Sequence, residues 1–155
     1  GFRGRACPQL VSEALLSVWR EKAGAARYIH LAELTPAMNG GFQLSDGALS
    51  LDEIRNTELH ADMVVITARG TAAQQQQRAR AFLDGGAEWV LVTNWDLPDR
   101  FRVRYLGNIY DSMNQERPPI RAMSEGRNRM INDGMTSLNW DDPAVWGVFT
   151  LFGKP

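Results

Sequence analysis

The sequence predicts an α/β domain of three layers, in which helices cover both faces of a mostly parallel sheet. Segments 63–67 and 89–94 are nearly continuous apolar runs, which is the pattern of strands buried on both faces. A helical segment separates them at the spacing of a right-handed strand–helix–strand unit. The length of 155 residues fits one domain.

The elements before these two strands follow from periodicity and from breakers. Residues 11–23 carry apolar side chains at helical spacing, with Ser12 as the expected N-cap. Residues 28–32 are a short apolar strand. The glycine-rich segment 35–50 predicts a long loop with a hairpin around residues 45–47.

The remaining elements are helical, apart from a last strand. The helix over residues 71–84 is expected to face the core through Ala79, Phe82 and Leu83 and to end at the following glycine pair. The further expected elements are helices over 51–56, 96–114 and 120–132, a loop over 134–143 and a strand over 145–152.

Composition removes several classes of function. A net charge of -1 gives no global basic field for nucleic acid. One cysteine, Cys7, excludes a disulfide framework and favours the cytoplasm. No apolar run approaches the roughly 20 residues of a membrane span. Two histidines and one cysteine do not make a zinc site, and no glycine-rich phosphate motif follows a strand. We therefore expect a cytoplasmic protein without metal or cofactor.

The candidate site follows from the predicted sheet. In an open parallel sheet, ligands bind at the carboxyl ends of the strands. Those ends deliver the loops 33–35, 68–70 and 94–96. The candidate cleft or binding residues are Glu33, Leu34, Arg69, Asn94, Trp95, Asp96 and Asp99.

An ordered set of short blocks makes a family resemblance specific. The blocks begin with Tyr28-Ile29-His30-Leu31-Ala32 and continue through segments 41–47, 51–54, 61–68, 80–87 and 94–95, ending with residues 146–153. In this order they resemble the CHAT family, caspase-like domains often attached to tetratricopeptide repeats. The resemblance runs from about Tyr28 to Gly153 and implies a caspase-like, clan CD cysteine peptidase fold. Such folds generally have a strand before the first helix, and this sequence shows no obvious one.

The same resemblance places the catalytic dyad. The family pattern is His-x-Ala-x-His-Gly, and its second His is the catalytic base. His30 and Ala32 match its first fixed positions, so the base position falls on Leu34. The family's Ser-Ala-Cys motif, which ends in the nucleophile, reads Thr67-Ala68-Arg69. Leucine cannot accept a proton, and arginine stays charged and cannot attack a carbonyl. The resemblance therefore implies a member without catalytic residues.

Several residues have two interpretations. Arg69 either pairs internally with Glu33 or Asp96, which we favour, or clamps an anionic ligand. His30 is more often a packed, hydrogen-bonded core residue than a base. His60 is expected on the surface, and Cys7 is expected to be an unpaired thiol without a role.

The leading hypothesis is a pseudo-enzyme that acts as a protein-interaction or regulatory module. We expect residues 1–155 to be one CHAT-like domain in the C-terminal part of a larger protein, whose own tetratricopeptide repeats are one possible partner. A peptide would lie between loop 33–42 and segment 69–78. Trp95 is expected to pack in the core beside this cleft, and Trp140 is the better interface candidate. One rival is an active cysteine peptidase whose catalytic residues have a different registration or are supplied from outside this chain; Cys7 is the testable thiol. The other rival is an anion-binding domain that uses Arg69.

Overall fold

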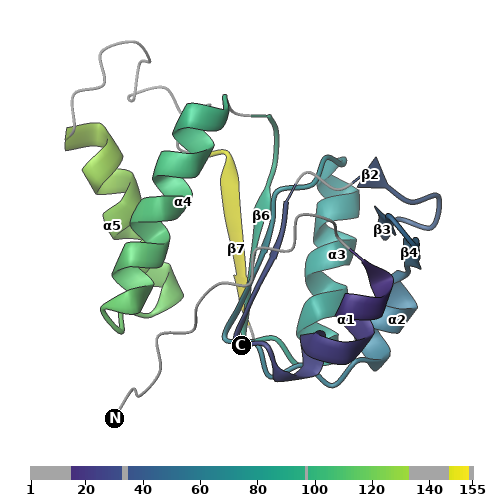
Figure 1. The fold of residues 1–155 in the computed structure, drawn as a ribbon. Helices are drawn as coiled ribbons and strands as arrows, with labels where there is room; N and C mark the ends of the chain where they lie inside the picture. The colour runs from purple at the N-terminus through teal and green to yellow at the C-terminus, as the bar shows by residue number, and fades with distance from the viewer. Residues whose placement is uncertain (1–14, 33–34, 97, 133–146, 154–155) are drawn as a thin grey trace.

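The computed structural model describes residues 15–32, 35–96, 98–132 and 147–153. Its helices are α1 (Leu16–Lys22), a short 3₁₀ turn η1 (Ala23–Ala25), α2 (Leu51–Asn56), α3 (Ala72–Gly85), α4 (Asp99–Asn114) and α5 (Pro119–Asn132). Its strands are β1 (Tyr28–Leu31), β2 (Thr35–Pro36), β3 (Phe42–Leu44), β4 (Gly47–Leu49), β5 (Met63–Ile66), β6 (Trp89–Thr93) and β7 (Phe149–Gly153) (Figure 1).

The main sheet has the strand order β1-β5-β6-β7. β1 is parallel to β5 and β5 to β6, whereas β7 runs antiparallel to β6. The mostly parallel sheet is therefore confirmed, with one antiparallel strand at its end. β1 lies at an edge of the sheet. Residues 1–14, which precede α1 and where a further strand would have to lie, are outside the described residues.

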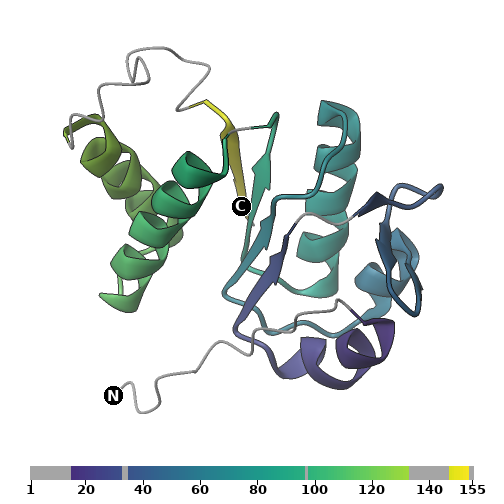
Figure 2. The same ribbon diagram turned by 45° about the horizontal axis from the view of Figure 1, so that its top comes forward.

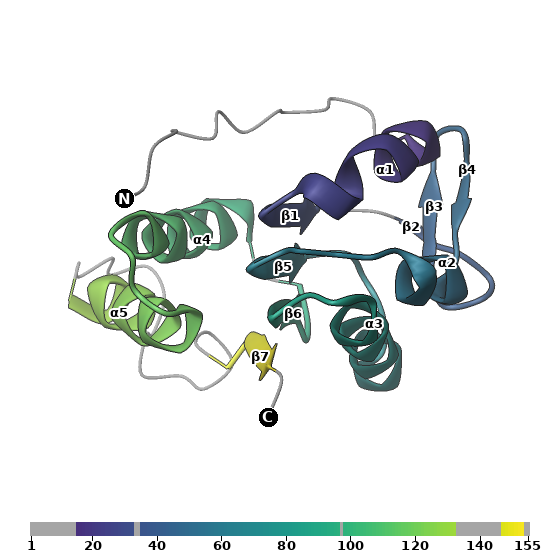
Figure 3. The same ribbon diagram turned by 90° about the horizontal axis from the view of Figure 1, so that it is seen from below.

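Helices cover both faces of this sheet, which confirms the three layers. Seen from below, the row of strands separates α4 and α5 from α1, α2 and α3 (Figure 3). Because successive residues of a strand point to opposite faces, β5 supplies both cores. Val64 and Ile66 belong to the core beneath α3, and Met63 and Val65 belong to the core beneath α4.

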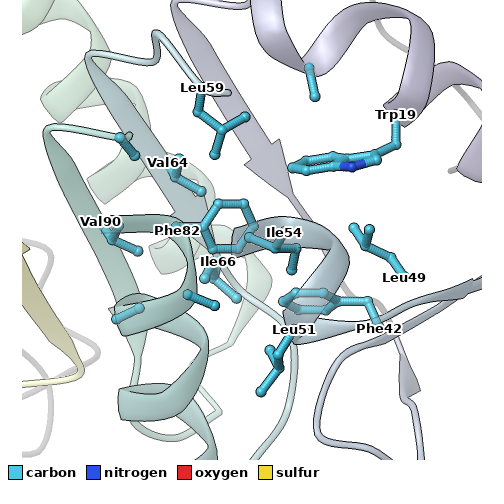
Figure 4. Packing of buried hydrophobic residues seen from close by; sticks show 14 of the residues in the cluster. Trp19, Phe42, Leu49, Leu51, Ile54, Leu59, Val64, Ile66, Phe82 and Val90 are labelled. Atoms are coloured by element: carbon cyan, nitrogen blue, oxygen red, sulfur yellow. The ribbon is translucent and has the colours of Figure 1, made fainter. Parts of the chain in front are cut away.

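Aromatic side chains hold the α1–α3 side together. Trp19 from α1 meets Phe82 from α3 edge to face, with ring centroids 5.9 Å apart, and Phe42 from β3 lies 6.4 Å from Phe82 (Figure 4). All three are buried. Edge-to-face pairs are favourable because the positive rim of one ring meets the negative face of the other.

A small antiparallel sheet of β2, β3 and β4 lies on the same side as α1 to α3 (Figure 2). Its β3–β4 turn supplies the N-cap of α1, since the Asp46 carboxylate accepts hydrogen bonds from the backbone N–H of Leu16 and, at 3.1 Å, of Ser17. The Ser17 hydroxyl donates to the same carboxylate at 3.0 Å. These bonds satisfy N–H groups that a helix start leaves free, so a residue 30 positions away caps the helix.

Local signals explain most boundaries. Thr71 and Gln74 form a capping box at the start of α3. Gly86 ends α3 at φ +120°, and a Cβ there would lie 2.3 Å from the Leu59 carbonyl oxygen, so only glycine fits. Ser50 caps α2, which spans the predicted residues 51–56.

The outcome differs among the remaining expectations. The predicted helix over 96–114 begins later, at Asp99, because Pro98 holds an extended conformation before it. Leu83 packs against the core as predicted, although it is only partly buried. The hairpin predicted within 35–50 is confirmed as the β3–β4 hairpin of the small sheet. Ser12, Trp140, the loop 134–143 and the start of the last predicted strand lie outside the described residues.

Candidate functional site

Of the three predicted loops, the structure describes 68–70 and 94–96 in full and 33–35 only in part. The loop after β1 contains Glu33 and Leu34, which lie outside the described residues. After β5, Ala68 is buried and Arg69 is exposed. After β6, Asn94 is half-buried, and Trp95 and Asp96 are exposed. Because β5 and β6 are parallel neighbours, their loops share one edge of the sheet.

Arg69 pairs with one of its two predicted partners. Its Nε lies 3.3 Å from Asp96 Oδ2. Both side chains are exposed, at 80% and 69%. An exposed pair of this kind contributes at most about 1 kcal/mol to stability. The expected ion pair is therefore present, but it lies on the surface and leaves both groups within reach of a ligand.

Trp95 departs from the core position expected for it. Its exposed fraction is 46%. It follows Asn94 and precedes Asp96, so the loop after β6 exposes an aromatic side chain beside the carboxylate that pairs with Arg69. Exposed tryptophan is enriched at protein interfaces.

Asn94 and Asp99 hold the framework. The Asn94 amide donates to the Gly147 carbonyl at 3.1 Å and to the Thr150 hydroxyl at 2.9 Å, which fixes the loop after β6 against the β7 segment. Asp99 accepts a hydrogen bond from Arg102 at 2.7 Å in the first turn of α4. These contacts explain both residues without a ligand.

A buried glutamine beneath the site was not recognised from the sequence. Gln75, on α3, is 1% exposed. Its Nε2 donates to the carbonyl of Ala68 at 2.7 Å and to the carbonyl of Thr93 at 2.8 Å. One side-chain amide therefore ties together the ends of β5 and β6. Gln75 is thus on the buried face of α3, whereas the neighbouring Gln76 and Gln77 are exposed.

Arg78, one turn further along α3, is fully buried. Its guanidinium donates to the carbonyls of Gly40 at 3.0 Å, Gly41 at 3.3 Å and Arg69 at 2.8 Å, and to Gln75 Oε1 at 3.1 Å. It also lies over the ring of Phe42, 4.7 Å from its centroid. Burial lowers the pKa of Arg78, since a dry environment disfavours its charge.

Helical spacing was the signal for these two residues. Gln75 lies three residues before Arg78, and Arg78 lies four residues before Phe82. At this spacing all three residues lie on one face of α3, the face that is buried. A polar residue on an apolar helical face needs a polar partner in the interior. Read in that way, the sequence would have predicted a buried network, though not the carbonyls that complete it.

Arg78 also bridges the two sides of the predicted peptide cleft between loop 33–42 and segment 69–78. Its guanidinium joins Gly40 and Gly41 to Arg69, so the 33–42 and 69–78 segments are bonded to each other at this level. A Cβ on Gly70 would lie 2.8 Å from Arg78 Nη1, so a side chain at position 70 would displace the guanidinium from its place. A peptide separating the two segments would have to break these bonds.

A second polar group lies on the α4 side of β1. The His30 Nδ1 is 3.2 Å from the Tyr110 hydroxyl, and its Nε2 is 3.5 Å from the Thr67 hydroxyl. His30 is exposed on the edge strand rather than packed in the core as expected, although its predicted hydrogen bonding is confirmed. Partial desolvation lowers the pKa of His30, and the charge of Arg102 lowers it further.

This group borders a shallow hollow of about 450 Å³. β1, β5 and the segments after them contribute His30, Ala32 and Thr67, and α4 contributes Arg102, Val103, Leu106, Gly107 and Tyr110. Its lining is mainly apolar.

The other histidine, His60, has a side chain that is 71% exposed, as expected.

Within the described segments, no group of three His, Cys, Asp or Glu side chains could hold a metal ion. Across the same ranges, none of the helices combines the length and apolar character that a membrane crossing requires.

The fold and site define an α/β domain of caspase-like, peptidase-related architecture, with an arginine at the end of its first central strand. The model of the CHAT domain matches residues 7–154, so the chain belongs to the CHAT domain family. No curated protein matches this chain.

Proposed function

We propose that this CHAT domain is non-catalytic and acts as a protein-interaction or regulatory module. The observation that carries the proposal is the ion pair of Arg69 and Asp96 at the end of β5. In the family registration, Arg69 stands where the nucleophilic cysteine belongs and Leu34 stands where its base belongs. A thiolate peptidase needs both groups, and neither of these side chains can perform either role.

The surface that supports partner binding is the group of exposed side chains after β5 and β6. Arg69, Trp95 and Asp96 offer a cation, an aromatic ring and an anion on one edge of the sheet. Gln75 and Arg78 hold the backbone beneath them. A fixed surface favours binding because less conformational entropy is lost on association. A peptide or protein partner, such as tetratricopeptide repeats of the same protein, fits this chemistry.

A second candidate is an anion-binding domain. The Arg69 guanidinium is exposed and forks well onto a carboxylate or phosphate, which would replace Asp96 as its partner. This alternative predicts that phosphate or a dicarboxylate raises the melting temperature and that Arg69→Ala abolishes the shift.

A peptide array tests the interaction proposal. The purified chain is incubated with immobilised peptides, and both retained protein and peptide mass are measured. We expect retention with every peptide intact, and weaker retention for Arg69→Ala and Trp95→Ala. Arg80→Ala is the matched control, since Arg80 is exposed on α3 and pairs with Asp84. Absence of retention, or equal loss with the control, would contradict binding at this surface.

A further inference from the structure

The buried guanidinium of Arg78 is bonded to three carbonyls that come from two separate segments. Gly40 and Gly41 belong to the connection between β2 and β3, and Arg69 belongs to the connection between β5 and α3. In the described residues, all of its hydrogen-bond acceptors are amide or peptide carbonyl oxygens. Two connections that are separate in sequence thus meet at one planar group carried by α3.

A buried charge at this position needs a structural reason. Transfer of a charged group from water to the interior is costly, and the acceptors described around Arg78 are neutral oxygens rather than a carboxylate. An apolar side chain could fill the same space beside Phe42 but could not satisfy the carbonyls. What the guanidinium adds is a rigid set of donors that fixes several acceptors at once.

We propose that Arg78 is a positioning residue that holds the β2–β3 connection and the Arg69 loop as one unit. Its Nη1 bond to the Arg69 carbonyl sets the backbone from which the Arg69 side chain projects. Gln75 supports the guanidinium through its Oε1 and fixes the neighbouring Ala68 carbonyl. This inference concerns the internal organisation of the site and holds whether or not a partner binds there.

Hydrogen exchange of the whole chain, followed by mass spectrometry, tests the coupling. Arg78→Lys keeps the charge but loses the planar fork, and Arg78→Met keeps much of the volume but loses every donor. We expect exchange to accelerate about tenfold or more in peptides covering both residues 37–44 and residues 66–72, with Met exceeding Lys. Peptides from α4 and α5 should change little. Arg80→Met is the matched control on the same helix and should leave both segments unchanged.

Chemical rescue separates positioning from general packing. Arg78→Ala leaves the carbonyls around an empty space that guanidinium fits and methylammonium does not. Millimolar guanidinium, well below denaturing concentrations, should restore slow exchange in both segments in a saturable way, and methylammonium should not.

The outcomes decide the proposal. Faster exchange in both segments together, reversed by guanidinium, supports it. Acceleration in one segment only, uniform acceleration across α4 and α5, or no acceleration overturns it. If Arg78→Met or Arg78→Ala does not fold, Arg78→Lys carries the test, and an unchanged exchange pattern in that folded variant overturns the proposal.

Discussion

The Nε of Arg69 lies 3.3 Å from Oδ2 of Asp96, while the backbone carbonyl of Arg69 accepts a hydrogen bond from Arg78 at 2.8 Å. The side chain of this residue is therefore at the surface and its main chain is bonded to the interior. Two arginines nine positions apart thus have opposite environments in one small region. That contrast leads to the first prediction.

Arg69→Ala and Arg78→Met should differ strongly in stability. Removing the exposed Arg69 is expected to change the free energy of unfolding by less than about 0.5 kcal/mol. Removing Arg78 leaves buried carbonyls without donors and should cost roughly 2–4 kcal/mol. Urea denaturation of each variant measures both values. Equal effects would show that the buried bonds do not contribute as inferred.

The Asp46 cap predicts a stability change at acidic pH. The pKa of Asp46 is lowered chiefly by the hydrogen bond from the backbone N–H of Leu16. The backbone N–H and the hydroxyl of Ser17 lower it further. Because this pKa is lower in the folded state, the ionised Asp46 stabilises the fold. The stabilisation is complete above the ordinary Asp pKa of about 4 and is lost as pH falls through the folded-state pKa.

Asp46→Ala should therefore lower the melting temperature at neutral pH by a few degrees, and the difference from wild type should shrink in strong acid. Thermal unfolding followed by circular dichroism at several pH values measures this. Asp111→Asn, at an exposed position on α4, is the control. A constant difference at every pH would contradict a role for the Asp46 charge.

His30 should make stability fall in mild acid. Its pKa is lowered in the folded state, so folding favours the neutral ring. The free energy of unfolding is therefore highest above the ordinary His pKa of about 6.5 and decreases as pH falls from there toward the lower folded-state pKa of His30. His30→Gln should remove this part of the decrease, measured as melting temperature between about pH 5 and pH 8. His60→Gln, at an exposed site, should keep it.

Phe82→Ala tests the aromatic core. Phe82 is fully buried between Trp19 and Phe42, so its removal leaves a cavity and should cost about 3–5 kcal/mol. Met38→Ala, at a fully exposed side chain, should change the free energy of unfolding by less than about 0.5 kcal/mol. Guanidinium denaturation compares the two, and a similar small loss in both would mean that the cavity collapses.

The fold could be predicted where local signals and the tertiary structure agree. The apolar runs of β5 and β6, the Ser50 cap and the Gly86 stop are each determined by neighbours in sequence. The antiparallel direction of β7 could not be predicted in this way, because an apolar strand has the same composition in either direction. The Asp46 cap of α1 was also hidden, since it joins residues 30 positions apart.

The site could be predicted only in part. The sheet geometry placed Arg69 and Asp96 on one edge, and their ion pair confirms it. Arg78 and Gln75 were missed because their partners are main-chain carbonyls, which every residue carries and which sequence alone does not distinguish. The hollow beside His30 depends on the approach of α4 to β1, a long-range contact without a local signal.

Cleavage of a peptide library tests the central claim most directly. The purified chain and its Cys7→Ser variant are incubated with the library, and new termini are identified by mass spectrometry. A non-catalytic CHAT domain predicts no cleavage by either protein. Cleavage by the wild-type chain that is lost in Cys7→Ser would show an active cysteine peptidase with a nucleophile elsewhere than position 69, and would contradict the proposal.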